Sequence, residues 1–123
     1  MKKVLLVDDT PEIAELLSYA LLDRGYEVSV TSFTTSINEL IADEQAQALI
    51  LDCTILNMSE SLFDMVRDEP RHAGLPVVII SDTPDEAIAG LRARHAQHVR
   101  LVPKPFSGSQ VAAALEELLE PVS

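Results

Sequence analysis

Apolar positions along the chain fall into two patterns, which are short continuous runs and longer stripes with helical spacing. The short runs cover residues 4–7, 26–30, 48–51, 77–80 and 99–102. The run at 4–7 has no alternation of apolar and polar residues, which is typical of a strand buried on both faces of a sheet. We therefore predict five strands, each followed by a segment with helical spacing.

The first predicted helix follows the run at 4–7. Thr10 is a candidate N-cap and Pro11 suits the first helical turn. Gly25 is expected to close this helix in a left-handed conformation. The apolar stripe expected to face inward consists of Ile13, Leu16, Leu17, Ala20 and Leu21.

Four more helices are predicted from the same spacing. They cover about 36–43, about 60–68, a segment that begins at Pro84, and a last segment whose stripe includes Val111 and Leu115. Strict alternation of strands and helices predicts repeated βα units with a parallel sheet and helices on both faces. In such folds ligands bind beyond the carboxyl ends of the strands.

Polar residues stand where four of the five apolar runs end. Asp8 and Asp9 follow the first run, Asp52 the third and Ser81 the fourth, and Lys104 comes just after the fifth. Each residue alone has an ordinary explanation, such as a helix cap, a turn or a solvated lysine. Together they predict that five side chains from four strands converge at one edge of the sheet.

The predicted group of side chains suits one kind of chemistry. Three crowded carboxylates repel one another, and Mg²⁺ relieves that repulsion while it keeps several waters. A carboxylate can attack a phosphoryl group to form an aspartyl phosphate. A lysine ammonium and a hydroxyl can then stabilise the phosphoryl oxygens. The sequence therefore predicts phosphoryl transfer to an aspartate.

Composition narrows the class of protein. The 123 residues, 47% of them hydrophobic, predict one packed domain over residues 1–123. The net charge of −11 argues against direct binding to nucleic acid. No apolar run approaches the roughly 20 residues that span a bilayer. Cys53 is the single cysteine, which excludes an intramolecular disulfide, and we expect a cytoplasmic protein.

The sequence resembles the receiver domains of response regulators in two-component signalling. The matching stretches are residues 4–9, residues 49–52, residues 77–81 and Lys104-Pro105-Phe106, so the resemblance covers essentially the whole chain. It implies an α/β, flavodoxin-like, doubly wound five-stranded parallel sheet with strand order 2-1-3-4-5 and five helices. It also implies a cis peptide bond between Lys104 and Pro105, and a signalling switch rather than an enzyme.

The resemblance also implies roles for the residues at the strand ends. A histidine kinase or a histidine phosphotransfer protein would donate the phosphoryl group, a downstream protein or output domain would read the switch, and a homodimer stays open. The implied roles are Asp52 as phosphoacceptor, Asp8, Asp9, Asp52 and the backbone carbonyl of Thr54 as Mg²⁺ ligands, and Ser81 and Lys104 as contacts of the phosphoryl group.

Several positions depart from the family pattern. Ile55-Leu56 replaces Met-Pro, Glu60 replaces Gly, Asp82 replaces a small residue, and Leu101 replaces the switch aromatic. Because Leu101 lacks a polar ring tip, we expect switching to depend on repacking of the fourth helix and its loop. The departures also favour an alternative, which is a receiver-like interaction module that is rarely or never phosphorylated.

Two other classes fit the sequence less well. A phosphatase with an aspartyl intermediate would need an acid where Thr54 stands, and a flavodoxin would need a hydroxyl-rich loop in place of the anionic residues 8–11. His72, His95 and His98 are scattered, which argues against a histidine metal site. Arg92 and Arg94 are expected on a solvated helix face.

Overall fold

The computed structural model of the protein describes residues 2–119; the predicted domain range of 1–123 also includes residues 1 and 120–123, which lie outside the described residues. The described part contains five strands that alternate with five α-helices, together with a short 3₁₀ helix. These elements are β1 (Lys2–Asp8), α1 (Pro11–Leu22), β2 (Tyr26–Thr31), α2 (Ile37–Glu44), β3 (Ala48–Asp52), α3 (Leu56–Asp68), η1 (Pro70–His72), β4 (Val77–Ser81), α4 (Pro84–Ala93), β5 (Val99–Pro103) and α5 (Gly108–Leu119). The predicted order of elements is confirmed.

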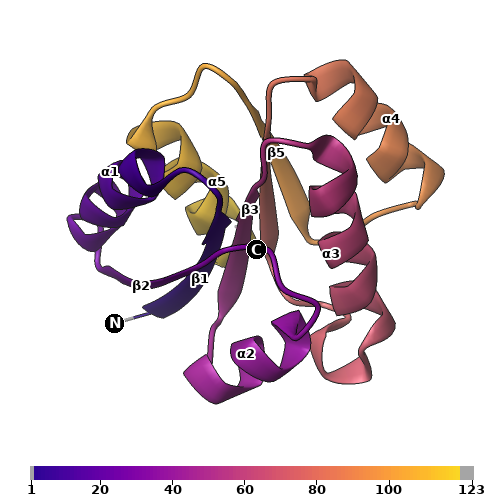
Figure 1. Ribbon diagram of the computed structural model, residues 1–123, viewed down its shortest axis with the longest axis horizontal. Helices are drawn as coiled ribbons and strands as arrows, with labels where there is room; N and C mark the ends of the chain where they lie inside the picture. Colours follow the sequence, from indigo (N-terminus) through magenta and orange to yellow (C-terminus); the bar gives the residue numbers. More distant parts are fainter. Residues whose placement is uncertain (1, 120–123) are drawn as a thin grey trace.

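All strand pairs are parallel, and the strand order is β2-β1-β3-β4-β5 (Figure 1). The expected flavodoxin-like fold is therefore confirmed. The register between β1 and β3 places Asp8 directly opposite Asp52. Two carboxylates far apart in the sequence thus become neighbours at the carboxyl edge of the sheet.

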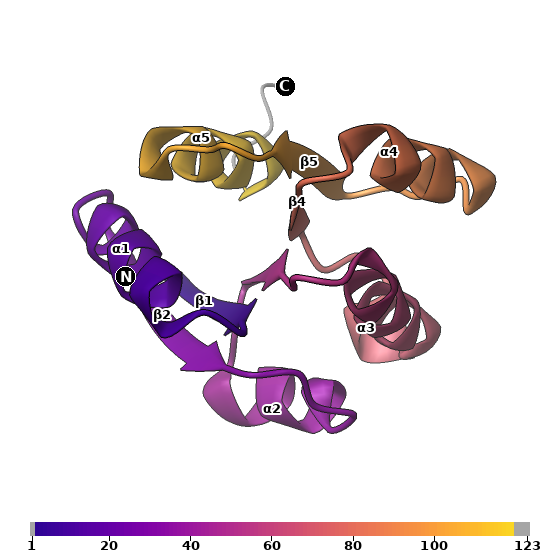
Figure 2. The ribbon, with the colours of Figure 1, turned by 45° about the horizontal axis from the view of Figure 1, so that its top comes forward.

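The helices cover both faces of the sheet. Helices α1 and α5 lie on one face and α2 and α3 on the other, with α4 beside β5 (Figure 2). Each central strand serves both layers, because successive side chains of a strand point to opposite faces. In β1, Leu6 packs in the core with α1 and α5, whereas Leu5 packs in the core with α2 and α3.

Helix α1 shows where the predicted stripe was too wide. Leu17 and Leu21 are buried, but Leu16 is 63% exposed, so its prediction as an inward residue was wrong. Successive residues lie about 100° apart around a helix, and here the face that contains Ala14 and Leu17 meets the sheet. Thr10 does occupy the N-cap position, but its side chain makes no capping hydrogen bond.

Other boundaries shift by a few residues. Helix α3 begins at Leu56, one turn before the predicted start near residue 60. Gly25 has a φ of 90°, the left-handed conformation expected for the turn after α1. No helix among residues 2–119 has the length and apolar character needed to cross a membrane.

Candidate functional site

The predicted site residues meet at the carboxyl edge of the sheet. Asp8, Asp52 and Ser81 are the last residues of β1, β3 and β4, and all three are buried. Lys104 directly follows β5, and its backbone N–H donates to the carbonyl of Ser81 at 2.8 Å. Parallel strands hold these residues together because their carboxyl ends lie at one edge.

Asp8 and Asp52 form a buried acidic pair. Their exposed fractions are 6% and 2%. Asp8 Oδ1 accepts a hydrogen bond from the backbone N–H of Thr10 at 2.9 Å, whereas Asp8 Oδ2 and Asp52 Oδ1 are buried without a hydrogen-bond partner. The pKa of Asp8 is raised to about 7, mainly by burial and also by the neighbouring Asp52 carboxylate, while the hydrogen bond from the Thr10 N–H acts to lower it. The pair therefore favours the uptake of a positive charge or a proton.

Lys104 supplies one positive charge to this pair. Its Nζ lies 3.0 Å from Asp52 Oδ1, and the contact is an ion pair without the angles of a hydrogen bond. Burial lowers the pKa of Lys104, but the contact with Asp52 and the charges of Asp82 and Asp8 outweigh this and raise it overall. The ammonium therefore stays charged beside the Asp52 carboxylate.

Asp9 is placed differently from its neighbour Asp8. It is exposed, and its Oδ2 accepts a hydrogen bond from the backbone N–H of Thr54 at 3.1 Å. Hydrogen bonding from Thr54 and Thr10 lowers the pKa of Asp9 despite partial burial. Within residues 2–119, no three His, Cys, Asp or Glu side chains form a ready metal-binding group. The structure thus pairs Asp8 with Asp52 and directs Asp9 to the Thr54 backbone.

The available oxygens nevertheless suit a Mg²⁺ ion. Mg²⁺ commonly binds through one or two carboxylates and retains several waters, so it does not need three converging side chains. Asp8 Oδ2 and Asp52 Oδ1 are the buried oxygens that lack hydrogen-bond partners here. A hard cation would compensate both, because two buried carboxylates beside a single lysine are costly.

The loop after β4 arranges the Ser81 hydroxyl. Ser81 Oγ accepts a hydrogen bond from the backbone N–H of Thr83 at 3.0 Å and lies 3.1 Å from Thr83 Oγ1. Thr83 was absent from the sequence predictions, although Ser-Asp-Thr before Pro84 is a recognisable turn signal. Asp82 between them is exposed at the rim of the site.

A hollow of about 270 Å³ opens beside Asp52 and Lys104. Its apolar lining includes Leu16, the residue whose exposure departs from the predicted stripe. The peptide bond between Lys104 and Pro105 is cis, as the resemblance implies. The other residues that line the hollow are Thr10, Ile13, Pro105 and Phe106.

Comparison with known proteins agrees with this geometry. TcrX of Mycobacterium tuberculosis, a "probable transcriptional regulatory protein", is 32% identical over 119 residues, which are 94% of this chain and 49% of the relative. This chain therefore spans about half the length of the curated relatives that it matches.

Solved structures share the fold at lower sequence identity. The chemotaxis response regulator CheY4 of Vibrio cholerae has a TM-score of 0.79 at 23% identity, over 96% of this chain and 98% of that chain. The receiver domain of sensor histidine kinase PA1611 from Pseudomonas aeruginosa, with a magnesium ion in its active-site cleft, has a TM-score of 0.76 at 18% identity. This likeness covers 96% of this chain and 97% of that chain.

A match to a whole family extends over nearly all of the described residues. The response regulator receiver domain family matches residues 4–116, from the second half of β1 into α5. The matched range contains the buried acidic pair, the Ser81 loop and Lys104. The chain therefore belongs to the response regulator receiver domain family.

Proposed function

We propose that this chain is a phosphoaccepting receiver domain in which Asp52 takes a phosphoryl group from a histidine kinase or a histidine phosphotransfer protein. One observation carries the proposal, which is the buried Asp8–Asp52 pair. One oxygen of each carboxyl group lacks a hydrogen bond, and the Lys104 ammonium lies 3.0 Å from Asp52 Oδ1. Such a pair is expensive for a fold to maintain without a ligand.

Mg²⁺ is the cofactor that we propose for this site. Asp8, Asp52 and the backbone carbonyl of Thr54 would hold the ion, with Asp9 as a ligand directly or through water. When bound, the ion neutralises negative charge at the carboxylates and on a phosphoryl group. The magnesium-containing receiver domain of PA1611, which shares this fold, is consistent with the proposal.

The chain's own residues have distinct parts in the transfer. A carboxylate oxygen of Asp52 forms a bond to phosphorus while the P–N bond of the donor phosphohistidine breaks, and the imidazole nitrogen keeps that electron pair. The Lys104 ammonium compensates charge on the phosphoryl oxygens. The Ser81 hydroxyl, which now accepts from the Thr83 N–H, would turn to donate to a phosphoryl oxygen.

The transferred group would change a surface that a partner reads. Reorganisation of Ser81 and its loop would move the start of α4, which begins at Pro84. A downstream protein or an output domain would bind one arrangement better and so shift the population. We further propose that residues 1–123 form a single receiver domain of a cytoplasmic phosphorelay protein.

A second candidate function is a receiver-like interaction module that is rarely or never phosphorylated. Asp82 favours it, because this exposed carboxylate at the rim acts on Lys104 and would repel an anionic phosphodonor. The same buried acidic pair and Lys104 contact argue for the first candidate. The two differ in one measurable property, which is the modification of Asp52.

Intact mass after treatment with acetyl phosphate and Mg²⁺ tests the proposal. We expect the mass to rise by one phosphoryl group in the wild-type chain and in Asp43→Asn, a control at an exposed aspartate in α2. Asp52→Asn should show no gain. If the folded wild type gains no mass and its NMR spectrum does not respond to beryllium fluoride, the interaction module becomes the better reading.

A further inference from the structure

Helix α4 buries few apolar side chains in the core. Within Pro84–Ala93, all of which the structure describes, Ala87 is the single buried residue. Leu91 is only partly buried against the core on this face of the sheet. Helix α3, by contrast, buries Leu62, Phe63 and Val66. The position of α4 therefore depends strongly on contacts outside the core.

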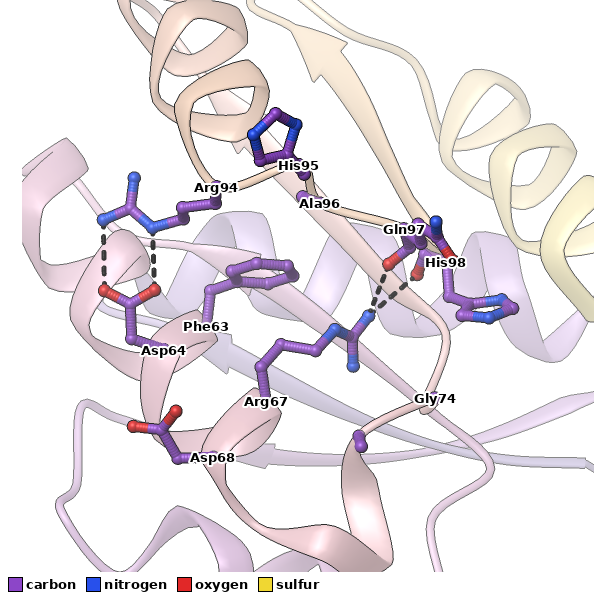
Figure 3. A pocket seen from close by; sticks show the side chains of 11 residues that line it. Phe63, Asp64, Arg67, Asp68, Gly74, Arg94, His95, Ala96, Gln97 and His98 are labelled. Carbon is purple, nitrogen blue, oxygen red and sulfur yellow. Dashed lines mark hydrogen bonds and ion pairs between the residues drawn. The ribbon is translucent and has the colours of Figure 1, made fainter.

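Arg94, the residue that follows α4, provides such contacts. Its guanidinium forms two hydrogen bonds to Asp64 of α3, with Nε to Oδ1 at 2.7 Å and Nη2 to Oδ2 at 3.1 Å (Figure 3). Its Nη1 also donates to Glu60 Oε2 at 3.2 Å and to the carbonyl of Gly90 at 2.9 Å. We call Arg94, Asp64, Glu60 and Gly90 the Arg94 clamp. Arg94 is exposed, as predicted, but the sequence did not indicate that it joins α4 to α3.

Gly90 allows Glu60 to lie close against α4. A Cβ atom added at Gly90 would collide with Glu60 Oε2 and would lie 3.2 Å from Nη1 of Arg94, so these two flexible side-chain ends would have to move out of their present contact. The missing side chain on α4 thus accommodates the glutamate that replaces a family glycine on α3. The glycine in α4 and the glutamate in α3 therefore fit one contact.

A second arginine holds the loop that follows the clamp. Arg67 of α3 donates to the carbonyls of Gln97 and His98 at 3.0 and 3.1 Å, and its guanidinium stacks over the Phe63 ring at 4.8 Å (Figure 3). The two arginines line the same groove, which has a volume of about 720 Å³. The carboxyl end of α4 is therefore tied to α3, while its amino end continues from the Ser81 loop.

We propose that the Arg94 clamp holds α4 in its unphosphorylated position and thereby opposes the switch at Asp52. This inference rests on the proposed function of Asp52. In the phosphorylated arrangement that we propose, α4 has moved away from α3; that movement breaks the bidentate contact of Arg94 with Asp64, so the contact opposes it. Linkage is reciprocal, and a weaker clamp must therefore make a phosphoryl group or its mimic bind more tightly.

The expected change in beryllium fluoride binding follows from the exposure of the Arg94–Asp64 ion pair. The side chains of Arg94 and Asp64 are 32% and 50% exposed, so water and salt screen their interaction. Removing a single exposed pair typically changes an equilibrium by up to about five-fold. We expect a change of about three- to five-fold in the half-saturating concentration of beryllium fluoride.

Titration with beryllium fluoride at constant Mg²⁺, followed by amide NMR, tests this inference on four chains. These are wild type, Arg94→Gln, Gly90→Ala and the control Arg24→Gln, which breaks an ion pair with Glu116 far from α4. Arg94→Gln and Gly90→Ala should reach half-saturation at lower concentration, and Arg24→Gln should match wild type. Urea unfolding should show that Arg94→Gln is no more stable than wild type. Tighter binding could then not be explained by a more stable native state.

The outcomes separate this inference from the proposed function. A normal wild-type response with unchanged Arg94→Gln and Gly90→Ala overturns the clamp alone. No response in any chain overturns the proposed function and the clamp together. Two further chains complete a cycle, which are Asp64→Asn and the double variant Asp64→Asn with Arg94→Gln. The double variant should match Arg94→Gln, because both changes remove the same contact, and shifts that add up would contradict the clamp.

Discussion

The acidic pair at the edge of the sheet and the Arg94 clamp differ in how far their charged groups are buried and hydrogen-bonded. Asp8 and Asp52 are almost completely buried and leave two oxygens without hydrogen bonds. The clamp is partly exposed, and its arginine makes four hydrogen bonds. Two buried carboxylates that share a single lysine make the first region responsive to ligands, whereas paired charge makes the second a restraint.

The two regions also differ in which segments they connect. The acidic pair is part of the parallel ladder between β1 and β3, so its geometry follows from a rigid sheet. The clamp joins a firmly packed helix to one with a single buried residue in its described length. A ligand at the rigid region can therefore be read through movement of the loosely packed helix.

The largest expected effect is on stability when the acidic pair loses a charge. The ordinary pKa of Asp8 is 3.8 and its pKa in the fold is about 7, so the fold holds a proton in this range that the unfolded chain releases. The stability from that proton is complete below about pH 4 and is lost as pH rises to about 7. Asp8→Asn should therefore raise the free energy of unfolding at pH 8 by up to about 4 kcal/mol, since a pKa raised from 3.8 to about 7 costs about 1.4 kcal/mol for each tenfold change in proton affinity.

Urea unfolding of wild type and Asp8→Asn at pH 5 and pH 8 measures this difference without Mg²⁺. The gain should be smaller at pH 5, where wild-type Asp8 keeps its proton. Asp43→Asn serves as the exposed control and should change little at either pH. A variant less stable than wild type at pH 8 would show that the carboxylate is not under electrostatic strain.

Mg²⁺ should stabilise the chain by an intermediate amount. At ten times the dissociation constant, binding to the native state alone adds about 1.4 kcal/mol. A proton on Asp8 competes with the ion, and because the pKa of Asp8 is about 7, the stabilisation should be larger at pH 8 than at pH 6. Thermal unfolding with and without MgCl₂ measures it. Equal stabilisation of wild type and Asp52→Asn would place the ion elsewhere.

Arg94→Gln should lower the free energy of unfolding by about 1 kcal/mol at low salt. An exposed ion pair usually contributes less than this, and the bidentate geometry of Arg94 with Asp64 adds slightly to it. The loss should shrink in about 1 M NaCl, where screening acts within about 3 Å. Urea unfolding at both salt concentrations gives the comparison. A loss that is independent of salt would mean that Arg94 acts through packing rather than through charge.

The smallest expected effect concerns β5. If the edge site acts on α4 and its clamp, a ring at position 101 is not needed for uptake of the phosphoryl group. Leu101→Tyr should therefore change the rate of modification by acetyl phosphate by less than about two-fold, because Leu101 packs against the same apolar core as Leu91 of α4. Time courses of intact mass provide the rate. A large change would assign β5 a part in the reaction.

Much of the fold could be predicted because local patterns and topology agree. The continuous apolar runs of β1, β3 and β4 are buried on both faces, and the polar residues that end them lie at one edge of the sheet. The helix boundaries were less accurate, as at Leu56, where helical backbone begins before the apolar stripe gives a signal. The sequence also did not indicate which face of α1 would meet the sheet, so it could not show that Leu17 is buried and Leu16 exposed.

The sequence by itself determined the order of strands and helices along the chain and the edge of the sheet at which Asp8, Asp9 and Asp52 lie, because hydrophobic periodicity and chain connectivity are local properties. Only the tertiary structure decided that Asp8 is buried while Asp9 turns to Thr54. Only it could join Arg94 to Asp64, which lies 30 residues away in the sequence. Such contacts depend on how whole elements pack, and no local pattern carries that information.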